Sequence, residues 1–261
     1  WVPGMDVVQI QGNQYRYLED SLLNRSMAPL PEPIQAMNDL HRLVTGYRLY
    51  EQPRILDLRR AGSKVSSDTE LAALGENAFS VLRNWKAGRK EHEERWTFVR
   101  SGLQECFPEL FEDLEFEVAG QTVTVRLYLR HLREPVDVLS APHGLLVALL
   151  HLCAVASTPD HGALAIDEPE NGLHPFAIKT LLDLMRSRAR ARDLTILLAT
   201  HSPVVLNTFN TEPNRVYIME PVHEVLPVPL DQHSDPEWLA HFALGDLYSD
   251  QAFGAQQRPP A

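Results

Sequence analysis

The chain has 261 residues, 44% of them hydrophobic and 23% charged, a composition that is typical of a globular protein and excludes disordered and collagen-like classes. Its 24 lysines and arginines against 35 aspartates and glutamates give a formal net charge of −11, so no chain-wide attraction to nucleic acid or anionic lipid is expected. The two cysteines, Cys106 and Cys153, are isolated, which excludes a disulfide framework and favours a reducing, cytoplasmic location. The longest apolar run, Leu145 to Ala156, falls short of the roughly 20 residues that span a bilayer, so no membrane partner is expected.

Residues 1–135 are predicted to form a helical portion that contains one β-hairpin. Hydrophobic residues recur at helical spacing in Ala36–Leu49, Asp68–Trp85 and Glu91–Cys106, which predicts three packed helices. Between about residues 114 and 129 the spacing changes to two, which predicts a two-stranded antiparallel hairpin with one buried face.

In residues 136–230 the sequence pattern predicts short apolar strands that alternate with long helices. Residues 231–261 are expected to form a C-terminal helix and a frayed tail. Alternation of this kind predicts parallel strands joined by crossover helices. The fold class is therefore α/β. The strands are expected at Ala163–Ile166, Thr195–Ala199 and Val216–Met219, and the helices at Leu145–Val155 and Phe176–Arg192.

Two carboxylates end the first of these strands. Asp167 and Glu168 are expected at the carboxyl edge of the sheet, where α/β proteins bind ligands. Adjacent strand residues point apart, so one acid can hold a hydrated Mg²⁺ while the other addresses an attacking water. Taken alone, the pair fits a solvated strand end equally well. However, the next strand ends in Thr200-His201-Ser202-Pro203, which brings a histidine, a candidate donor to a terminal phosphate, to the same edge.

These motifs together resemble the SMC-like and RecF-like branch of the ABC-type ATPases, particularly the predicted bacterial AAA-type ATPases related to the OLD proteins. The resemblance rests on IDEPENGLHP (Ile166–Pro175) and LLATHSPVVLN (Leu197–Asn207). LGENAFSVLRNW (Leu74–Trp85) and WLAHFALGDLY (Trp238–Tyr248) support it more loosely. The similarity covers most of the chain after about residue 35 and implies an ABC-ATPase-like lobe.

The resemblance implies a role for each motif residue. Asp167 corresponds to the Walker B acid that coordinates Mg²⁺ through water, Glu168 to the general base for hydrolysis, and His201 to the switch histidine that reaches the γ-phosphate. Asn171 and Gly172 correspond to the D-loop at a dimer seam. The implied cofactors are ATP and Mg²⁺, and the implied partners are a second copy of the chain and either an effector protein or DNA.

The segment Leu139–Gly144 (LSAPHG) corresponds to the family's signature segment but departs from it. Ser140 is in place at a predicted helix N-terminus, which is a usable anion site. However, Pro142 removes a backbone donor, and His143 adds bulk where a partner's nucleotide would approach. Whether this segment functions as a signature is left open by the sequence.

A second departure is that the sequence contains no GxxxxGK[ST] phosphate-binding loop. Gly62–Ser67 is interpreted as a polar loop, and the arginines of Arg186–Arg192 as the solvent-facing side of a helix rather than a DNA track. Without a basic cradle, repulsion between nucleotide and acids costs about 4 kcal/mol per charge pair at 4 Å, so this chain alone is expected to bind ATP poorly. We therefore expect either the C-terminal part of an ATPase, inactive without an N-terminal Walker A lobe, or a catalytically degenerate interaction module.

Overall fold

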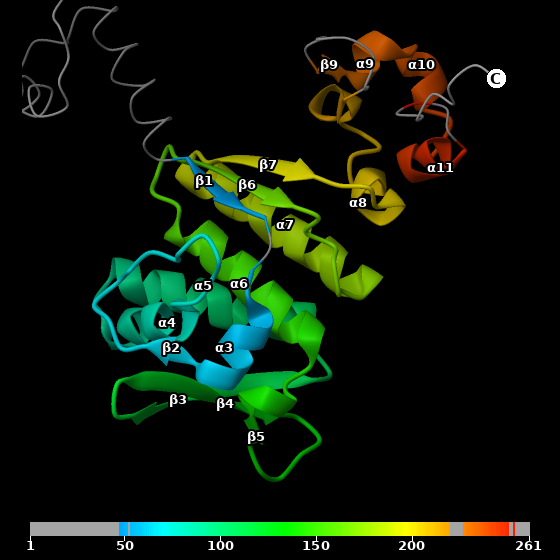
Figure 1. Ribbon diagram of the computed structural model, residues 1–261. Helices are drawn as coiled ribbons and strands as arrows, with labels where there is room; N and C mark the ends of the chain where they lie inside the picture. Colours follow the sequence, from blue (N-terminus) through cyan, green and yellow to red (C-terminus); the bar gives the residue numbers. More distant parts are fainter. Residues whose placement is uncertain (1–46, 52, 220–226, 251–252, 254–261) are drawn as a thin grey trace, which may run out of the picture. The chain divides into compact units, whose positions relative to one another are not determined.

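The computed structural model describes residues 47–51, 53–219, 227–250 and 253. All of these belong to one compact unit, Thr45–Ala261. The unit is α/β, as predicted, and combines a parallel sheet with helices and an antiparallel sheet (Figure 1). None of the helices in this part of the chain has the length and apolar character needed to cross a membrane.

The parallel sheet has three strands in the order β1 (Arg48–Tyr50), β6 (Ala163–Asp167), β7 (Thr195–Ala199). Helix α7 (Pro175–Arg192) joins β6 to β7, as the predicted strand–helix–strand pattern requires. The strands are in register, with Asp167 opposite Ala199. Both strands therefore end at one edge, and the loops that follow them begin side by side.

One face of this sheet and both of its lateral edges are open in the described part of the chain. Helices α6 (His143–Ser157) and α7 lie on one face (Figure 1). On β1 and β7, Leu49 and Leu197 are 43% and 54% exposed, so large apolar side chains face outward. No described strand pairs with the outer edge of β1 or of β7. An unpaired edge strand presents backbone N–H and C=O groups with which a further strand can pair.

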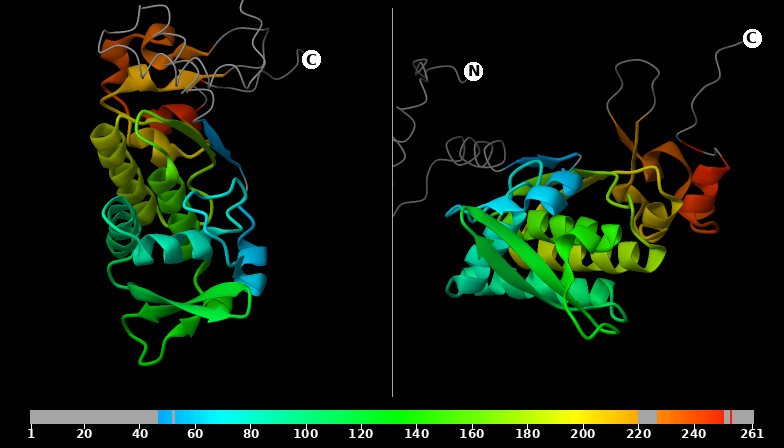
Figure 2. Two further views of the ribbon diagram at one scale, coloured as in Figure 1. Left: turned by 90° about the vertical axis from the view of Figure 1, so that its left-hand side faces the viewer. Right: turned by 60° about the horizontal axis from the view of Figure 1, so that its bottom comes forward.

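Helix α6 is the centre of the core. All of its residues from Leu145 to Ser157 are buried, because α7 and α5 (Glu91–Cys106) pack on it and α4 (Ala78–Ala87) adds to the same cluster. The antiparallel sheet lies beyond α4 and α5 (Figures 1 and 2). Its strands are β2 (Ser63–Lys64), β3 (Phe111–Ala119), β4 (Thr122–Leu129) and β5 (Val136–Asp137).

The predicted hairpin is confirmed as β3 and β4, with Val123, Val125 and Leu127 fully buried. The remaining elements are α3 (Ile55–Ala61), η1 (Val138–Ser140), α8 (Pro203–Asn207), η2 (Pro213–Arg215), β8 (Tyr217–Ile218), β9 (Val228–Pro229), α9 (Leu230–His233), α10 (Pro236–Leu239) and α11 (Leu244–Ser249). The last three form a smaller apolar cluster with parts of α8 and β8. Residues 251–252 and 254–261 of the predicted tail lie outside the described residues.

The helix predicted over Asp68–Trp85 is wrong in its first half, because α4 begins only at Ala78. Gly75 has a φ of 75°, a left-handed conformation that breaks a helix. The side chain of Asn77 accepts from the Ala72 amide at 2.8 Å and donates to the Glu70 carbonyl at 3.0 Å. Side-chain hydrogen bonds of this kind give the backbone an alternative to the helical pattern.

Three smaller predictions also need correction. Arg48–Leu49, expected at the end of a helix over Ala36–Leu49, belong to β1, and residues 36–46 lie outside the described part. The Val216–Met219 strand pairs antiparallel with β9 and does not extend the parallel sheet. Gly62–Ser67 is not simply a polar loop: Ser63 is buried in β2, donates to the Glu76 carbonyl and accepts from the Phe79 amide.

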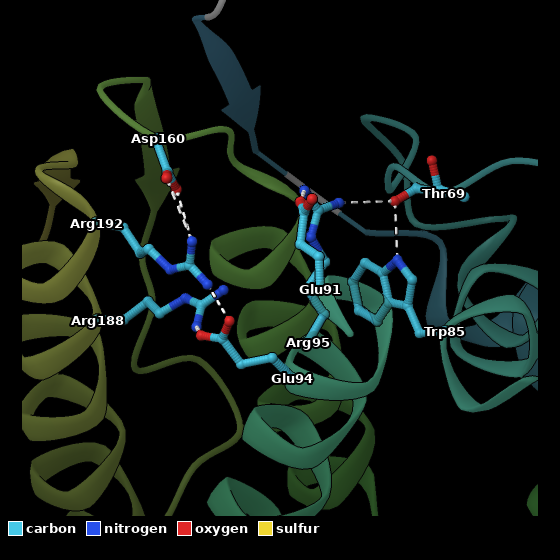
Figure 3. A network of polar contacts seen from close by, with 8 residues as sticks. All are labelled: Thr69, Trp85, Glu91, Glu94, Arg95, Asp160, Arg188 and Arg192. Atoms are coloured by element: carbon cyan, nitrogen blue, oxygen red, sulfur yellow. Dashed lines mark hydrogen bonds and ion pairs between the residues drawn. The ribbon is translucent and has the colours of Figure 1, made fainter. Parts of the chain in front are cut away.

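The arginines of α7 are not a purely solvent-facing row. Arg188 is 8% exposed and donates to Glu94 of α5 at 2.6 Å, and Arg192 pairs with both Glu94 and Asp160 (Figure 3). These pairs lower the pKa of the Glu94 carboxyl below its usual range, chiefly through the Arg192 hydrogen bond. Positive charges that bind α7 to α5 are not available as a track for a polyanion.

Candidate active site

The candidate site lies where β6 and β7 end. Asp167 is the last residue of β6, is exposed, and makes no side-chain hydrogen bond or ion pair with any described residue. His201 follows β7 by two residues and is also exposed. The amide of Glu168 donates to the Ala199 carbonyl at 2.8 Å, which continues the β6–β7 pairing beyond the strands. The structure therefore brings Asp167, Glu168 and His201 to the same sheet edge.

Glu168 adopts a left-handed backbone conformation with a φ of 45°. This conformation costs a non-glycine residue about 1–3 kcal/mol and persists where surrounding bonds enforce it. Here the enforcing bonds come from Asn171, whose amide donates to the Glu168 carbonyl at 3.1 Å and whose side chain donates to Oε2 of Glu168. Asn171 thus fixes both the backbone and the carboxylate of the predicted base.

The loops after β6 and β7 are joined by a pair that the sequence did not single out. The hydroxyl of Thr200 donates to Oε1 of Glu170 at 2.7 Å and accepts from the Ser202 amide at 3.0 Å. His201 lies between these two residues, so Glu170 anchors the histidine-bearing loop to the acidic loop. The other carboxylate oxygen of Glu170, Oε2, is buried without a partner among the described residues.

Helix α6 contacts the loop that follows β6 from the side of the hydrophobic core. His151 is buried, and its imidazole interacts with the backbone of Pro169, which offers only a carbonyl and so makes the histidine the donor. Burial lowers the pKa of His151 to about 4, with the Pro169 carbonyl acting weakly in the opposite direction. The side chain is therefore neutral and holds the loop from the core side.

The LSAPHG segment packs directly on the loop that contains Gly172. Gly172 has a φ of 76°, and a Cβ atom there would lie 2.6 Å from the His143 ring. A Cβ atom on Gly144 would lie 2.6 Å from the Gly172 carbonyl oxygen. Ser140 is exposed at the end of η1, close in sequence to this contact. The LSAPHG segment and the predicted D-loop thus meet at His143, Gly144 and Gly172.

Helix α6 begins at this contact without a side-chain cap. Pro142 is the residue before the helix, and the first helical amide bonded within it is that of Leu146, which donates to the Pro142 carbonyl. The amides of His143, Gly144 and Leu145 are free of such bonds, so the helix can still offer N–H groups to an anion. The missing amide of Pro142 is therefore a smaller departure than the sequence suggests.

His201 has one side-chain partner among the described residues. Its Nδ1 lies 2.9 Å from the hydroxyl of Tyr248, which belongs to α11. The opposite ring nitrogen, Nε2, has no described partner. The sequence offered a weak signal for this contact, since Tyr248 ends the loosely matching WLAHFALGDLY segment.

The donor groups suit a hydrated magnesium ion. Within the described residues no cluster of three histidine, cysteine or acidic side chains could enclose a metal. Mg²⁺, however, commonly keeps most of its waters and uses one or two carboxylates together with substrate phosphates, which fits the Asp167 carboxylate, since no described residue pairs with it. No described lysine or arginine pairs with Asp167, Glu168 or Glu170, so the phosphate charges find no basic partner here.

A family model described as "AAA domain, putative AbiEii toxin, Type IV TA system" matches residues 36–207, well over half of the chain. The chain belongs to this AAA-domain family. Its matched region contains both loops of the candidate site and ends with α8. No curated protein matches the chain.

Family membership makes this an AAA-type ATPase domain, a class that binds nucleotides. The resemblance to ABC-type ATPases noted from the sequence is in line with this assignment. The match stops before α9, α10 and α11, so the partner of His201 on α11 lies outside the region that the family describes.

Proposed function

We propose that the chain is the C-terminal part of an ATPase of the SMC-like and RecF-like branch, which hydrolyses ATP with Mg²⁺. The observation that carries the proposal is the hydrogen-bonded junction of the two loops, from Glu168 to Ala199 and from Glu170 to Thr200. It gives two acids and a histidine a common, exposed edge. Residues 136–230 form the ATPase-core half in this proposal, residues 1–135 the helical portion and residues 231–261 the C-terminal part.

Each residue has a chemically suitable task. Asp167 would hold a hydrated Mg²⁺, and that ion would supply positive charge to the phosphate oxygens. Glu168, held in place by Asn171, accepts a proton from the attacking water. His201 donates to the terminal phosphate from Nε2, which has no partner among the described residues. Positioning and charge compensation are the main demands of phosphoryl transfer.

The phosphate-binding loop is proposed to come from further polypeptide. The sequence has no GxxxxGK[ST] motif, and the acidic edge offers the phosphates no described basic partner. The open edge of β7 and the outward-facing Leu49 and Leu197 fit an added strand and a covering layer. If this added strand runs parallel to β7, a phosphate loop that follows it would lie at the carboxyl ends of the strands, beside Asp167 and His201.

A homodimer accounts for the contact between the LSAPHG and D-loop segments. Ser140 and the free amides at the start of α6 would contact nucleotide held by the partner subunit, next to Asn171 and Gly172. Closure of the dimer would then act on an effector protein or on DNA, and the description of the family suggests a toxin–antitoxin setting.

The alternative function is a non-catalytic interaction module. His143 favours it, because its ring fills the space beside Gly172 that a partner's nucleotide would approach. In this case the acidic edge would bind a protein, and the loops would keep their geometry without hydrolysing ATP.

Titration calorimetry distinguishes the two functions. We expect Mg-ATP to bind poorly to this chain and to bind with at least a hundredfold higher affinity to a natural form that includes a phosphate loop. Adding the loop supplies the missing positive charge, worth about 4 kcal/mol for one pair at 4 Å. An extended form that still fails to bind Mg-ATP would exclude the ATPase and leave the interaction module.

A further inference from the structure

The C-terminal helix α11 reaches the candidate site through one hydrogen bond. The Tyr248 hydroxyl and Nδ1 of His201 lie 2.9 Å apart although the residues are 47 positions apart in the chain. The bond leaves Nε2 as the ring nitrogen without a described partner. The hydrogen bond between Nδ1 and the Tyr248 hydroxyl therefore determines which ring nitrogen of His201 carries the proton.

Helix α11 is held firmly against the segment that follows His201. Side chains of Asn207 and Asn210 accept from the amides of Gly245 and Leu244 at 2.7 and 2.9 Å. A Cβ atom on Gly245 would lie 2.3 Å from the carbonyl oxygen of Pro203, so only glycine permits this approach. Pro203 starts α8, two residues after His201. The distance between Tyr248 and His201 is thus fixed by contacts at both ends.

The Tyr248 ring is fixed independently of the histidine. It packs against Phe253, with ring centroids 5.9 Å apart, and its helix carries Leu244 and Leu247 into the smaller apolar cluster. A ring held in this way presents its hydroxyl in one direction. The phenolic O–H is a good donor, and an unprotonated imidazole nitrogen is a good acceptor.

We propose that Tyr248 is a positioning residue that donates to Nδ1 of His201 and so keeps the imidazole in the form protonated at Nε2. That form presents an N–H to an anionic oxygen at the sheet edge. The opposite form would present a lone pair there and repel it. The catalytic consequence rests on the proposed function of His201, whereas the proton position itself does not.

The consequence is that α11 controls the site. Any partner that moves α11 away from α8 removes the hydroxyl from Nδ1 and frees the imidazole to change its proton and its orientation. The smaller apolar cluster, which follows the ATPase-core half, is thereby coupled to the terminal-phosphate end of the site.

Nitrogen NMR of this chain, labelled at histidine, tests the proton position directly. We expect the His201 signals of the unaltered chain to show protonated Nε2 and unprotonated, hydrogen-bonded Nδ1. Tyr248→Phe keeps the ring packing but removes the donor, so the Nδ1 signal should shift towards that of a free imidazole. Tyr217→Phe removes an exposed hydroxyl with no described partner and should leave His201 unchanged. Gly245→Ala, which displaces α11, should reproduce the Tyr248→Phe shift.

A turnover assay in a form with a phosphate loop separates this inference from the proposed function. Tyr248→Phe should lower kcat about 10–100-fold, as is typical when an orienting neighbour is lost, with little change in KM for ATP. Protonated Nδ1 in the unaltered chain, or identical His201 signals in Tyr248→Phe, would overturn the inference. A shifted Nδ1 signal with unchanged kcat would keep the pairing but overturn the positioning role of Tyr248, whereas loss of turnover in His201→Ala alone would still support the proposed function of His201.

Discussion

Glu168→Gln is expected to lower ATP turnover by about 10²–10⁴-fold, the usual contribution of a general base, while nucleotide binding is retained. Glutamine keeps an oxygen that can accept from Asn171, so the left-handed backbone at Glu168 should persist. Only the negative charge and the ability to take a proton are lost. Steady-state hydrolysis and Mg-ATP affinity should be measured together, in a form that contains a phosphate loop.

The matched control is Glu93→Gln. Glu93 is an exposed acid on α5 without a described ion pair, so its substitution removes the same charge at a remote place. Turnover of the control should equal that of the unaltered protein. Equal loss of binding and turnover in Glu168→Gln, or no loss of either, would show that Glu168 is not the base.

His151→Leu is expected to remove a pH dependence of stability of about 3 kcal/mol between pH 7 and pH 4, since the pKa shift from 6.5 to about 4 spans about two and a half units, each worth about 1.4 kcal/mol, and the last part of it lies below pH 4. Between these pH values the unfolded chain gains a proton at His151 and the folded chain does not. Stability supplied by neutral His151 is therefore complete above pH 6.5 and declines as the pH falls towards 4. The leucine side chain of the variant cannot take up a proton in either state.

Denaturant unfolding at pH 7 and pH 4 measures this difference. The unaltered chain should lose about 3 kcal/mol more than His151→Leu between the two pH values. The leucine variant should also be less stable at pH 7, by about 1–3 kcal/mol, because the Pro169 carbonyl loses its donor. His131→Leu, at an exposed turn, is the control and should behave like the unaltered chain. Parallel losses in all three proteins would contradict the burial of a neutral His151.

Much of the fold could be predicted from the spacing of hydrophobic residues, wherever a helix or strand buries one of its faces. Glu91–Cys106 is a helix with the predicted bounds, and the strands at residues 163 and 195 begin where predicted. Periodicity failed where side chains bond the backbone locally. Leu71 and Leu74 have helical spacing, yet Gly75 and Asn77 impose turns there.

The candidate site was only partly predictable. Parallel strands end at one edge, so Asp167 and His201 were expected together, and the register sets Asp167 opposite Ala199, two residues before His201. The contacts that orient the site depend on residues distant in sequence and could not be predicted from spacing. Thr200 with Glu170, His151 with Pro169 and Tyr248 with His201 are all of this kind.

The buried arginine of α7 shows the same limit. Arg188 alternates with solvent-facing residues and looked exposed by its sequence position, but a neighbouring helix supplies Glu94 and the ring of Phe98 beside it. A charged side chain can be buried once a partner neutralises it, and that partner lies 94 positions away in the chain. Only the fold brings the two together.

The most direct measurement of the central claim is paramagnetic broadening of histidine signals by Mn²⁺-ATP, in a form with a phosphate loop. If the two acids and His201 act on one nucleotide, the His201 signal should broaden beyond detection, whereas His161, roughly 20 Å away at the other end of β6, should remain sharp. Mg²⁺-ATP, which is not paramagnetic, should leave both signals visible. A His201 signal that stays sharp while Mn²⁺-ATP is bound would contradict the account.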